Sequence, residues 1–274
     1  RPGGPGMSTP QTIIHTRDLG RSFRVGSEEV VAVHDVSMEV RSGQFIAIVG
    51  RSGSGKSTLM NLLGVLDQPT RGQILLEGTD TGELDDKAAS RLRSRLIGFL
   101  FQSFNLIPQM TVLENVVLAV QAKAGHSYRF WRNASRDQNL TEPAMEALKR
   151  VGLQDQAMQV AGPLSHGEHR QLEMAMVLVT DPVLVLLDEP TAGMGQEDST
   201  RMIATLQALK GSRTIILVEH DMDAVFALAD KITVLVEGRV IATGEPEAIR
   251  SDKAVRQAYL GEELDEMPSF RAGP

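Results

Sequence analysis

The segment GRSGSGKST at residues 50–58 constrains the fold of this chain more than any other stretch. It matches the pattern G-x-x-x-x-G-K-[ST], follows the apolar run Gln44–Val49, and is followed directly by the helix-like run LMNLLGVL. A glycine-rich turn between a strand and a helix lets backbone N–H groups approach phosphate oxygens, because no side chain blocks them. The segment therefore predicts a phosphate loop that binds a nucleoside triphosphate.

The residue types of this phosphate loop have specific predicted roles. We expect Lys56 to reach the β- and γ-phosphates and the Ser57 hydroxyl to ligate Mg²⁺. The helix that follows adds the partial positive charge of its N-terminus. The other predicted phosphate-binding residues of the loop are Gly50, Ser52, Gly53, Ser54, Gly55 and Thr58.

Further apolar runs of strand length follow along the chain, separated by helical patterns such as the one at Glu197–Lys210. The apolar character of these runs is continuous, which is typical of parallel strands buried on both faces. Strands that alternate with helices favour an α/β core with a largely parallel sheet. The runs are Ile97–Phe101, Val183–Asp188, Thr214–Glu219 and Lys231–Gly238.

Two segments depart from this alternation. Residues from about 12 to 40 have the pattern of short β elements around a VGSEE turn, and residues from about 111 to 180 are almost entirely helical in pattern. We therefore predict a P-loop NTPase core with an N-terminal antiparallel β subdomain and an inserted helical subdomain. Within the latter, GHSYRFWRNASRDQN is expected to be a surface loop or a short amphipathic piece.

The predicted domain covers residues 12–261 and leaves both ends outside. Residues 1–11 are expected to be disordered, or residues 1–6 to precede a natural start at Met7, and residues 262–274 to form a flexible tail. The N-terminus lacks the hydrophobic core of a signal peptide, and every apolar run is far shorter than the ~20 residues of a membrane helix.

Charge and cysteine content exclude several classes of protein. The formal net charge of −7 argues against a general binder of nucleic acid or of anionic membranes. The chain has no cysteine, which excludes a disulfide scaffold and thiol chemistry and suits a reducing compartment.

Two carboxylates narrow the class of nucleotide enzyme. In VLVLLDEP, Asp188 ends a buried strand, from which it can face the metal near the phosphates. Glu189 follows directly and can orient or deprotonate a water molecule. No N-K-x-D motif for guanine is present, which counts against a GTPase.

The order of the motifs carries a resemblance to a known family. The phosphate loop is followed by Gln102 after a strand, then LSHGE at 164–168, then LLDEP, then His220 after a strand. In this order the chain resembles the nucleotide-binding subunits of ABC transporters from about residue 13 to residue 261. The resemblance implies ATP and Mg²⁺ as the bound molecules.

The resemblance also implies roles for residues outside the phosphate loop. Gln102 would sense Mg²⁺ and the attacking water, His220 would contact the γ-phosphate, and Phe23 would stack on adenine, where tyrosine is the usual residue. The segment 164–168 would be the signature motif, which binds the γ-phosphate of the ATP held by the opposite subunit. Its predicted nucleotide-binding residues are Ser165, Gly167 and Glu168.

The implied partners are a second ATP-binding subunit, identical or different, and transmembrane permease subunits, with no nucleic acid. They would place the chain on the cytoplasmic face of the inner or plasma membrane. The competing hypothesis is a soluble ABC-type ATPase that acts on ribosomes or DNA. Such proteins typically carry two nucleotide domains or long coiled coils, and this sequence has neither.

The chain departs from the family pattern at two positions. His166 stands where the signature motif usually has glycine, and Gly195 stands where a polar residue, often aspartate, is usual. We call residues 191–198, TAGMGQED, the D-loop. The glycine puts in doubt the hydrogen bonds that normally join the two subunits there.

The two halves resemble different branches of the family. Segments at 31–72 and 97–116 are similar to ATPases of lipoprotein release and macrolide efflux. From about residue 119 onward the chain is similar to ATPases of branched-chain amino-acid and urea importers. A natural recombinant, an engineered chimera and an intermediate lineage all fit. Because the helical subdomain supplies most of the groove for the membrane partner, we expect import of amino acids or urea, with export or release as the alternative.

Overall fold

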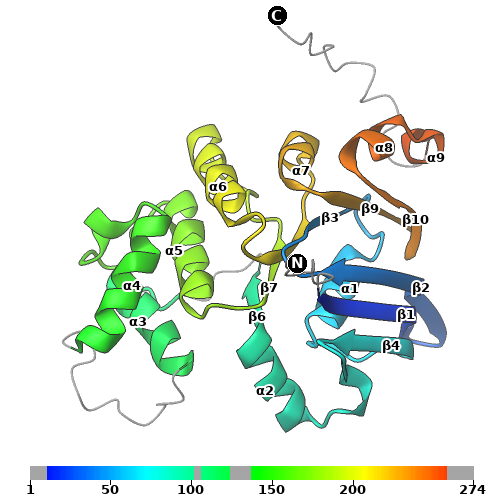
Figure 1. The fold of residues 1–274 in the computed structure, drawn as a ribbon, viewed down its shortest axis with the longest axis horizontal. Helices are drawn as coiled ribbons and strands as arrows, with labels where there is room; N and C mark the ends of the chain where they lie inside the picture. Colours follow the sequence, from blue (N-terminus) through cyan, green and yellow to red (C-terminus); the bar gives the residue numbers. More distant parts are fainter. Residues whose placement is uncertain (1–10, 102–105, 124–136, 258–274) are drawn as a thin grey trace, which may run out of the picture.

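A computed structural model describes residues 11–101, 106–123 and 137–257. Among the predictions that lie outside these ranges are Gln102, most of GHSYRFWRNASRDQN and the C-terminal tail. The described helices and strands form a layered α/β molecule with a group of helices at one end (Figure 1).

A six-stranded sheet forms the centre, with the strand order β10-β9-β3-β8-β7-β6. Its strands are β3 (Phe45–Val49), β6 (Ile97–Leu100), β7 (Leu184–Asp188), β8 (Thr214–Val218), β9 (Lys231–Val236) and β10 (Arg239–Gly244). All neighbours pair in parallel except β9 and β10, which are antiparallel. The prediction of a largely parallel sheet is confirmed.

Both faces of this sheet are buried, which explains the continuous apolar runs. Along β7, Val185 and Leu187 enter the core shared with the helical group, whereas Leu184 and Leu186 enter the core on the opposite face. Successive side chains of a strand point to opposite faces, so a strand covered on both sides needs apolar residues at every position.

A second sheet is antiparallel and has the order β2-β1-β4-β5. It consists of β1 (Thr12–Val25), β2 (Glu28–Arg41), β4 (Arg71–Leu76) and β5 (Thr79–Asp80). The antiparallel subdomain and the turn between β1 and β2 are as predicted, but the expectation of short β elements is wrong. Shifts in register, with Asp18 at φ 45°, interrupt the alternation along two 14-residue strands, so the sequence pattern resembles shorter pieces.

The inserted helical subdomain contains α3 (Val112–Lys123), α4 (Gln138–Arg150) and α5 (His166–Val179). These helices lie together at one end of the molecule, drawn in green in Figure 1. They share a core that includes Val116, Leu148 and Leu172. The prediction of an inserted helical subdomain is confirmed.

The remaining helices border the two sheets. They are α1 (Lys56–Leu63), α2 (Asp86–Leu96), α6 (Gln196–Leu209), α7 (Met222–Leu228), α8 (Pro246–Ser251) and α9 (Lys253–Val255), with the 3₁₀ turn η1 (Thr81–Glu83). A second 3₁₀ turn, η3 (Gln154–Gln156), contacts α4 in the helical subdomain. Within the described ranges, no helix is both long and apolar enough to cross a bilayer.

Candidate nucleotide site

The strand order brings three separate motifs to one edge of the central sheet. β8 lies between β3 and β7, and all three strands run in parallel. The phosphate loop follows β3, Asp188 and Glu189 stand at the end of β7, and His220 follows β8. Because the carboxyl ends of parallel strands lie at the same edge, these groups gather where open α/β sheets have their ligand crevice.

Lys56 is buried within the phosphate loop, with 6% of its surface exposed. Its Nζ donates hydrogen bonds to the carbonyl oxygens of Gly50 at 2.7 Å and Arg51 at 3.0 Å. Burial lowers the pKa of Lys56, and the nearby carboxylates of Glu189 and Asp188 oppose that shift. The lysine therefore shares the electrostatic environment of both acids.

Two glycines of the phosphate loop are required by close backbone contacts. At Gly55, with φ 99°, a Cβ would lie 2.2 Å from the carbonyl oxygen of Ala32 on β2. At Gly50 a Cβ would lie 2.3 Å from the carbonyl oxygen of Leu235 on β9. The two sheets press on this loop from both sides, so only glycine fits at these positions.

Asp188 fits a ligand for a hard divalent cation. Its Oδ1 atom is buried without a hydrogen-bond partner in the described part of the chain. Burial, and then the charge of Glu189, raises the pKa of Asp188, whereas the charges of Lys56, His220 and Arg170 lower it. A buried carboxylate oxygen left without a donor is the kind of atom that a cation satisfies.

Glu189 and His220 are in direct contact, with 2.5 Å between Oε1 and Nε2. Glu189 adopts a left-handed conformation with φ 50°, which is costly for a residue with a side chain. Its N–H donates to the carbonyl oxygen of Val218 at 2.9 Å, which anchors the turn to β8. The structure thus brings together two residues that are 31 positions apart in the sequence.

Sequence reasoning did not single out Glu219, which lies beside this pair and is only 3% exposed. Burial is the largest cause that raises its pKa to about 7, and the neighbouring charge of Glu189 adds to the shift. The available signal was an acidic residue directly after the apolar strand at 214–218. A buried acid at a crevice with a raised pKa is a candidate for a functional role.

The signature motif caps the N-terminus of α5. The Ser165 hydroxyl accepts a hydrogen bond from the Glu168 N–H at 3.2 Å, and the Glu168 carboxylate accepts one from the Ser165 N–H at 2.7 Å. The latter bond is the main cause that lowers the pKa of Glu168. This reciprocal pair is a capping box.

Figure 1 shows α5 grouped with α3 and α4, apart from α1 and the phosphate loop. Ser165 and Glu168 bond to each other, and a Cβ at Gly167 would meet Asp198 of α6, so these contacts lie where α5 meets α6. The predicted contact of these residues with the ATP of an opposite subunit agrees with this separation and stays a prediction.

The two departures from the family pattern have different surroundings. Ring atoms of His166 lie 3.1 and 3.3 Å from where a Cβ of Gly193 would stand, so this histidine faces the D-loop of its own chain. Gly195 is the N-cap of α6 without a side-chain hydrogen bond, and open space surrounds the position of a Cβ there.

Phe23 lies on β1 with 39% of its surface exposed, and the Arg21 guanidinium stands 4.7 Å from the centre of its ring. β1 pairs with β2, whose Ala32 carbonyl contacts the phosphate loop. The ring is therefore an exposed aromatic on the strand that pairs with β2, the strand in contact with that loop. Its predicted stacking on adenine stays a prediction.

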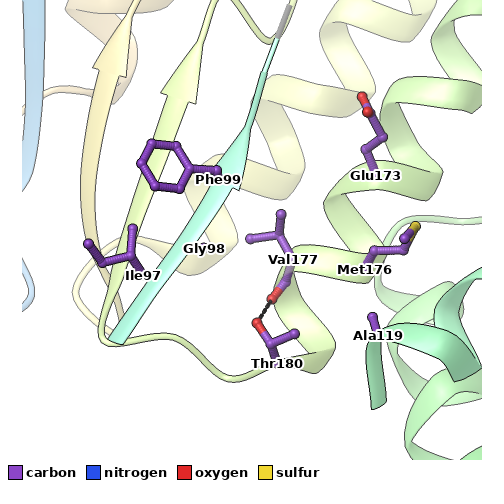
Figure 2. A pocket seen from close by; sticks show the side chains of 8 residues that line it. All are labelled: Ile97, Gly98, Phe99, Ala119, Glu173, Met176, Val177 and Thr180. Atoms are coloured by element: carbon purple, nitrogen blue, oxygen red, sulfur yellow. Dashed lines mark hydrogen bonds between the residues drawn. The ribbon is translucent and has the colours of Figure 1, made fainter. Parts of the chain in front are cut away.

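A separate pocket lies between the edge strand β6 and the helices α3 and α5 (Figure 2). Most of its lining is apolar, and includes Ile97, Phe99 and Val177. Its one acidic residue, Glu173, forms a buried ion pair with Arg170 at 3.1 Å. The pocket lacks the phosphate-binding loop, so it is distinct from the nucleotide crevice.

Comparisons with known proteins agree with this geometry. A family described as ABC transporter matches residues 33–192, and one described as branched-chain amino acid ATP-binding cassette transporter matches residues 239–265. The uncharacterized ABC transporter ATP-binding protein MJ0796 of Methanocaldococcus jannaschii is 32% identical over 83% of this chain and 95% of its own length. The uncharacterized ABC transporter ATP-binding protein YvrO of Bacillus subtilis is 36% identical over 84% of this chain and 96% of its own length.

A macrolide export ATP-binding/permease protein, MacB 2 of Aeromonas hydrophila, is 39% identical over 85% of this chain but only 34% of its own length. The chain thus spans about a third of the macrolide-export relatives that it matches. A solved dimeric structure of MJ0796 in a post-hydrolysis state, bound to ADP and Pi, superposes with a TM-score of 0.75. It is 30% identical and covers 85% of this chain and 98% of that one.

The chain belongs to the ABC transporter family, as an ATP-binding cassette. The predicted class of enzyme, an ATPase of the ABC type, is confirmed.

Proposed function

We propose that this chain binds ATP with Mg²⁺ and hydrolyses it to drive membrane-spanning partner subunits. The observation that carries the proposal is the meeting of the phosphate loop, Asp188, Glu189 and His220 at the carboxyl edge of β3, β8 and β7. Lys56 lies close enough to both acids for their charges to oppose the shift of its pKa.

The roles of the groups follow from their chemistry. On binding ATP, Lys56 exchanges its two carbonyl partners for phosphate oxygens, which a cation binds more strongly. Glu189 accepts a proton from the attacking water, and His220 holds the Glu189 carboxylate in place. Ser57 and Asp188, with Gln102, would hold Mg²⁺, which offsets the negative charge of the phosphates.

We further propose that two ATP-binding subunits close around two ATP molecules. The N-terminus of α5 is capped and lies apart from its own phosphate loop, so its anion-binding end is available to a second chain. A related cassette of known structure is dimeric. Whether the second subunit is identical depends on the assembly in the cell, and both cases use the same motif.

The partners we propose are permeases of the export or release type. The expected import of amino acids or urea is not supported, because the relatives matched over most of this chain include macrolide-export proteins. The match to the branched-chain amino-acid family is confined to residues 239–265. Binding to such permeases would hold the chain at the cytoplasmic face of the inner or plasma membrane.

The test is to express the chain with a permease of each type and to measure Mg²⁺-dependent release of phosphate together with co-purification. We expect stimulation and co-purification with the export or release type. Stimulation only by an importer-type permease would overturn the choice of partner and leave the ATPase proposal standing.

A further inference from the structure

The Glu219 carboxylate lies where two loops of the site meet. It accepts a hydrogen bond from the Thr191 hydroxyl, and the backbone N–H groups of His220 and Thr191 lower its pKa. Thr191 begins the D-loop, two residues after Glu189. One buried side chain therefore contacts the loop after β7 and the loop after β8 at the same time.

The turn that Glu219 contacts is strained and needs anchoring. Glu189 has φ 50°, and such a conformation persists only when its surroundings impose it. Two backbone bonds act on this turn, from Glu189 N–H to the Val218 carbonyl at 2.9 Å and from Ala192 N–H to the Glu189 carbonyl at 3.2 Å. The hydrogen bond from Thr191 to Glu219 and the contact between Glu189 and His220 add side-chain anchors to the same turn.

We propose that Glu219 is a positioning residue for ATP hydrolysis, which holds Glu189 and the start of the D-loop in register with His220. This inference rests on the proposed ATPase function. Glu219 acts through its hydrogen bonds to Thr191 and His220 and takes no part in proton transfer.

The surroundings of Glu219 disfavour a charged carboxylate. Its acidic neighbours Glu189 and Asp221 both disfavour another negative charge, and burial disfavours it further. Placing a carboxyl here therefore costs stability unless its hydrogen bonds offset that cost. The Glu219 carboxylate offsets this cost, because its oxygens accept donors from the two loops.

The experiment compares Glu219→Ala, Glu219→Gln and Thr191→Val in the full chain. Glu219→Ala should lower kcat about 10- to 100-fold, as expected for a small displacement of a reacting group, with KM for ATP changed less than about 3-fold. Glu219→Gln keeps an acceptor oxygen and should recover most of that kcat. Thr191→Val should also lower kcat. The double variant Glu219→Ala/Thr191→Val should have a kcat no lower than that of Glu219→Ala.

The matched control is Thr233→Val. Thr233 is also a buried threonine, but its hydroxyl contacts that of Thr243 at 3.2 Å, on β9 and β10. Its loss should leave kcat unchanged. A wild-type kcat in Glu219→Ala would overturn the inference, as would equal losses in Gln and Ala.

A double-mutant cycle on unfolding in urea separates this inference from the ATPase proposal. The effects of Glu219→Ala and Thr191→Val on the free energy of unfolding should be non-additive, because each substitution removes the same contact between the two side chains. If the wild-type chain hydrolyses no ATP, the proposed function fails. The double-mutant cycle then still tests the contact between Glu219 and Thr191. Additive effects would then overturn the positioning role.

Discussion

Lys56 is the cation of the crevice, and its two partners in the structure are carbonyl oxygens of the phosphate loop itself. A carbonyl oxygen carries only a partial charge, so charged phosphate oxygens bind the ammonium group more strongly than the carbonyl oxygens do. The loop is therefore already arranged for an anion at the level of single residues, and the charges of Asp188 and Glu189 favour the protonated lysine.

Lys56→Ala should abolish ATP binding or hydrolysis, because it removes the charge that balances the β- and γ-phosphates. Binding of a fluorescent ATP analogue and release of phosphate would measure the loss. Lys87→Ala, at an exposed position on α2, is the control and should leave both unchanged. Wild-type turnover in Lys56→Ala would contradict the assignment of the site.

The raised pKa of Glu219 predicts that the stability of the folded protein falls as the pH rises. Its folded pKa is raised from 4.5 to about 7, so the stability that it contributes is present below 4.5 and is lost as the pH rises through 7. Glu219→Gln, which stays neutral, should gain stability relative to wild type between pH 5 and pH 8, by on the order of 1–3 kcal/mol. Urea unfolding at several pH values measures this, and an unchanged difference across that range would contradict it.

At the scale of elements, α5 has two functions at its N-terminus. Its capping box satisfies N–H groups of its own first turn, while the helix dipole leaves this end attractive to an anion. Asp198 of α6 packs against it, since a Cβ at Gly167 would lie 2.2 Å from an Asp198 oxygen. The helix is thus fixed from within its own chain before a second chain arrives.

Ser165→Arg should spare nucleotide binding by the monomer and block ATP-dependent dimerisation, because a bulky side chain would clash with the opposing phosphate loop. Loss of the cap alone should cost about 1 kcal/mol of stability, which Ser165→Ala reports as the control. Size-exclusion chromatography with and without ATP measures the dimer. Reduced ATP affinity of the monomer would mean that the motif serves its own chain's site.

At the scale of the whole molecule, the central sheet carries the catalytic groups and the helical subdomain carries the signature motif at some distance (Figure 1). In the proposed assembly, each nucleotide site combines the phosphate loop of one chain with the signature motif of the other, so two chains complete both sites.

Glu189→Gln should retain ATP binding and lose roughly 10²–10⁴ of the hydrolysis rate, because an amide is a poor base. ATP that is bound but not cleaved should then hold two chains together as a stable dimer, which light scattering detects. A monomer at saturating ATP, with the membrane partner also present, would contradict the closed dimer.

The sequence alone determined the nucleotide class, the phosphate loop and the alternation of buried strands and helices. These features are set by local chemistry and by the spacing of residues within one element, so they can be recognised without tertiary contacts. The order of motifs added the family. The local pattern did not predict the length of β1 and β2, because register shifts interrupt the alternation along these two strands.

Only the tertiary structure decided which distant residues meet. The contact between Glu189 and His220 and the anchoring of Thr191 by Glu219 depend on β8 lying between β3 and β7, an order that is not the order of the chain. Parallel strands pair through long crossovers, so no local pattern reports which strand ends become neighbours. The same placement buries Glu219 and shifts its pKa, because desolvation is a property of the assembled crevice and not of the residue.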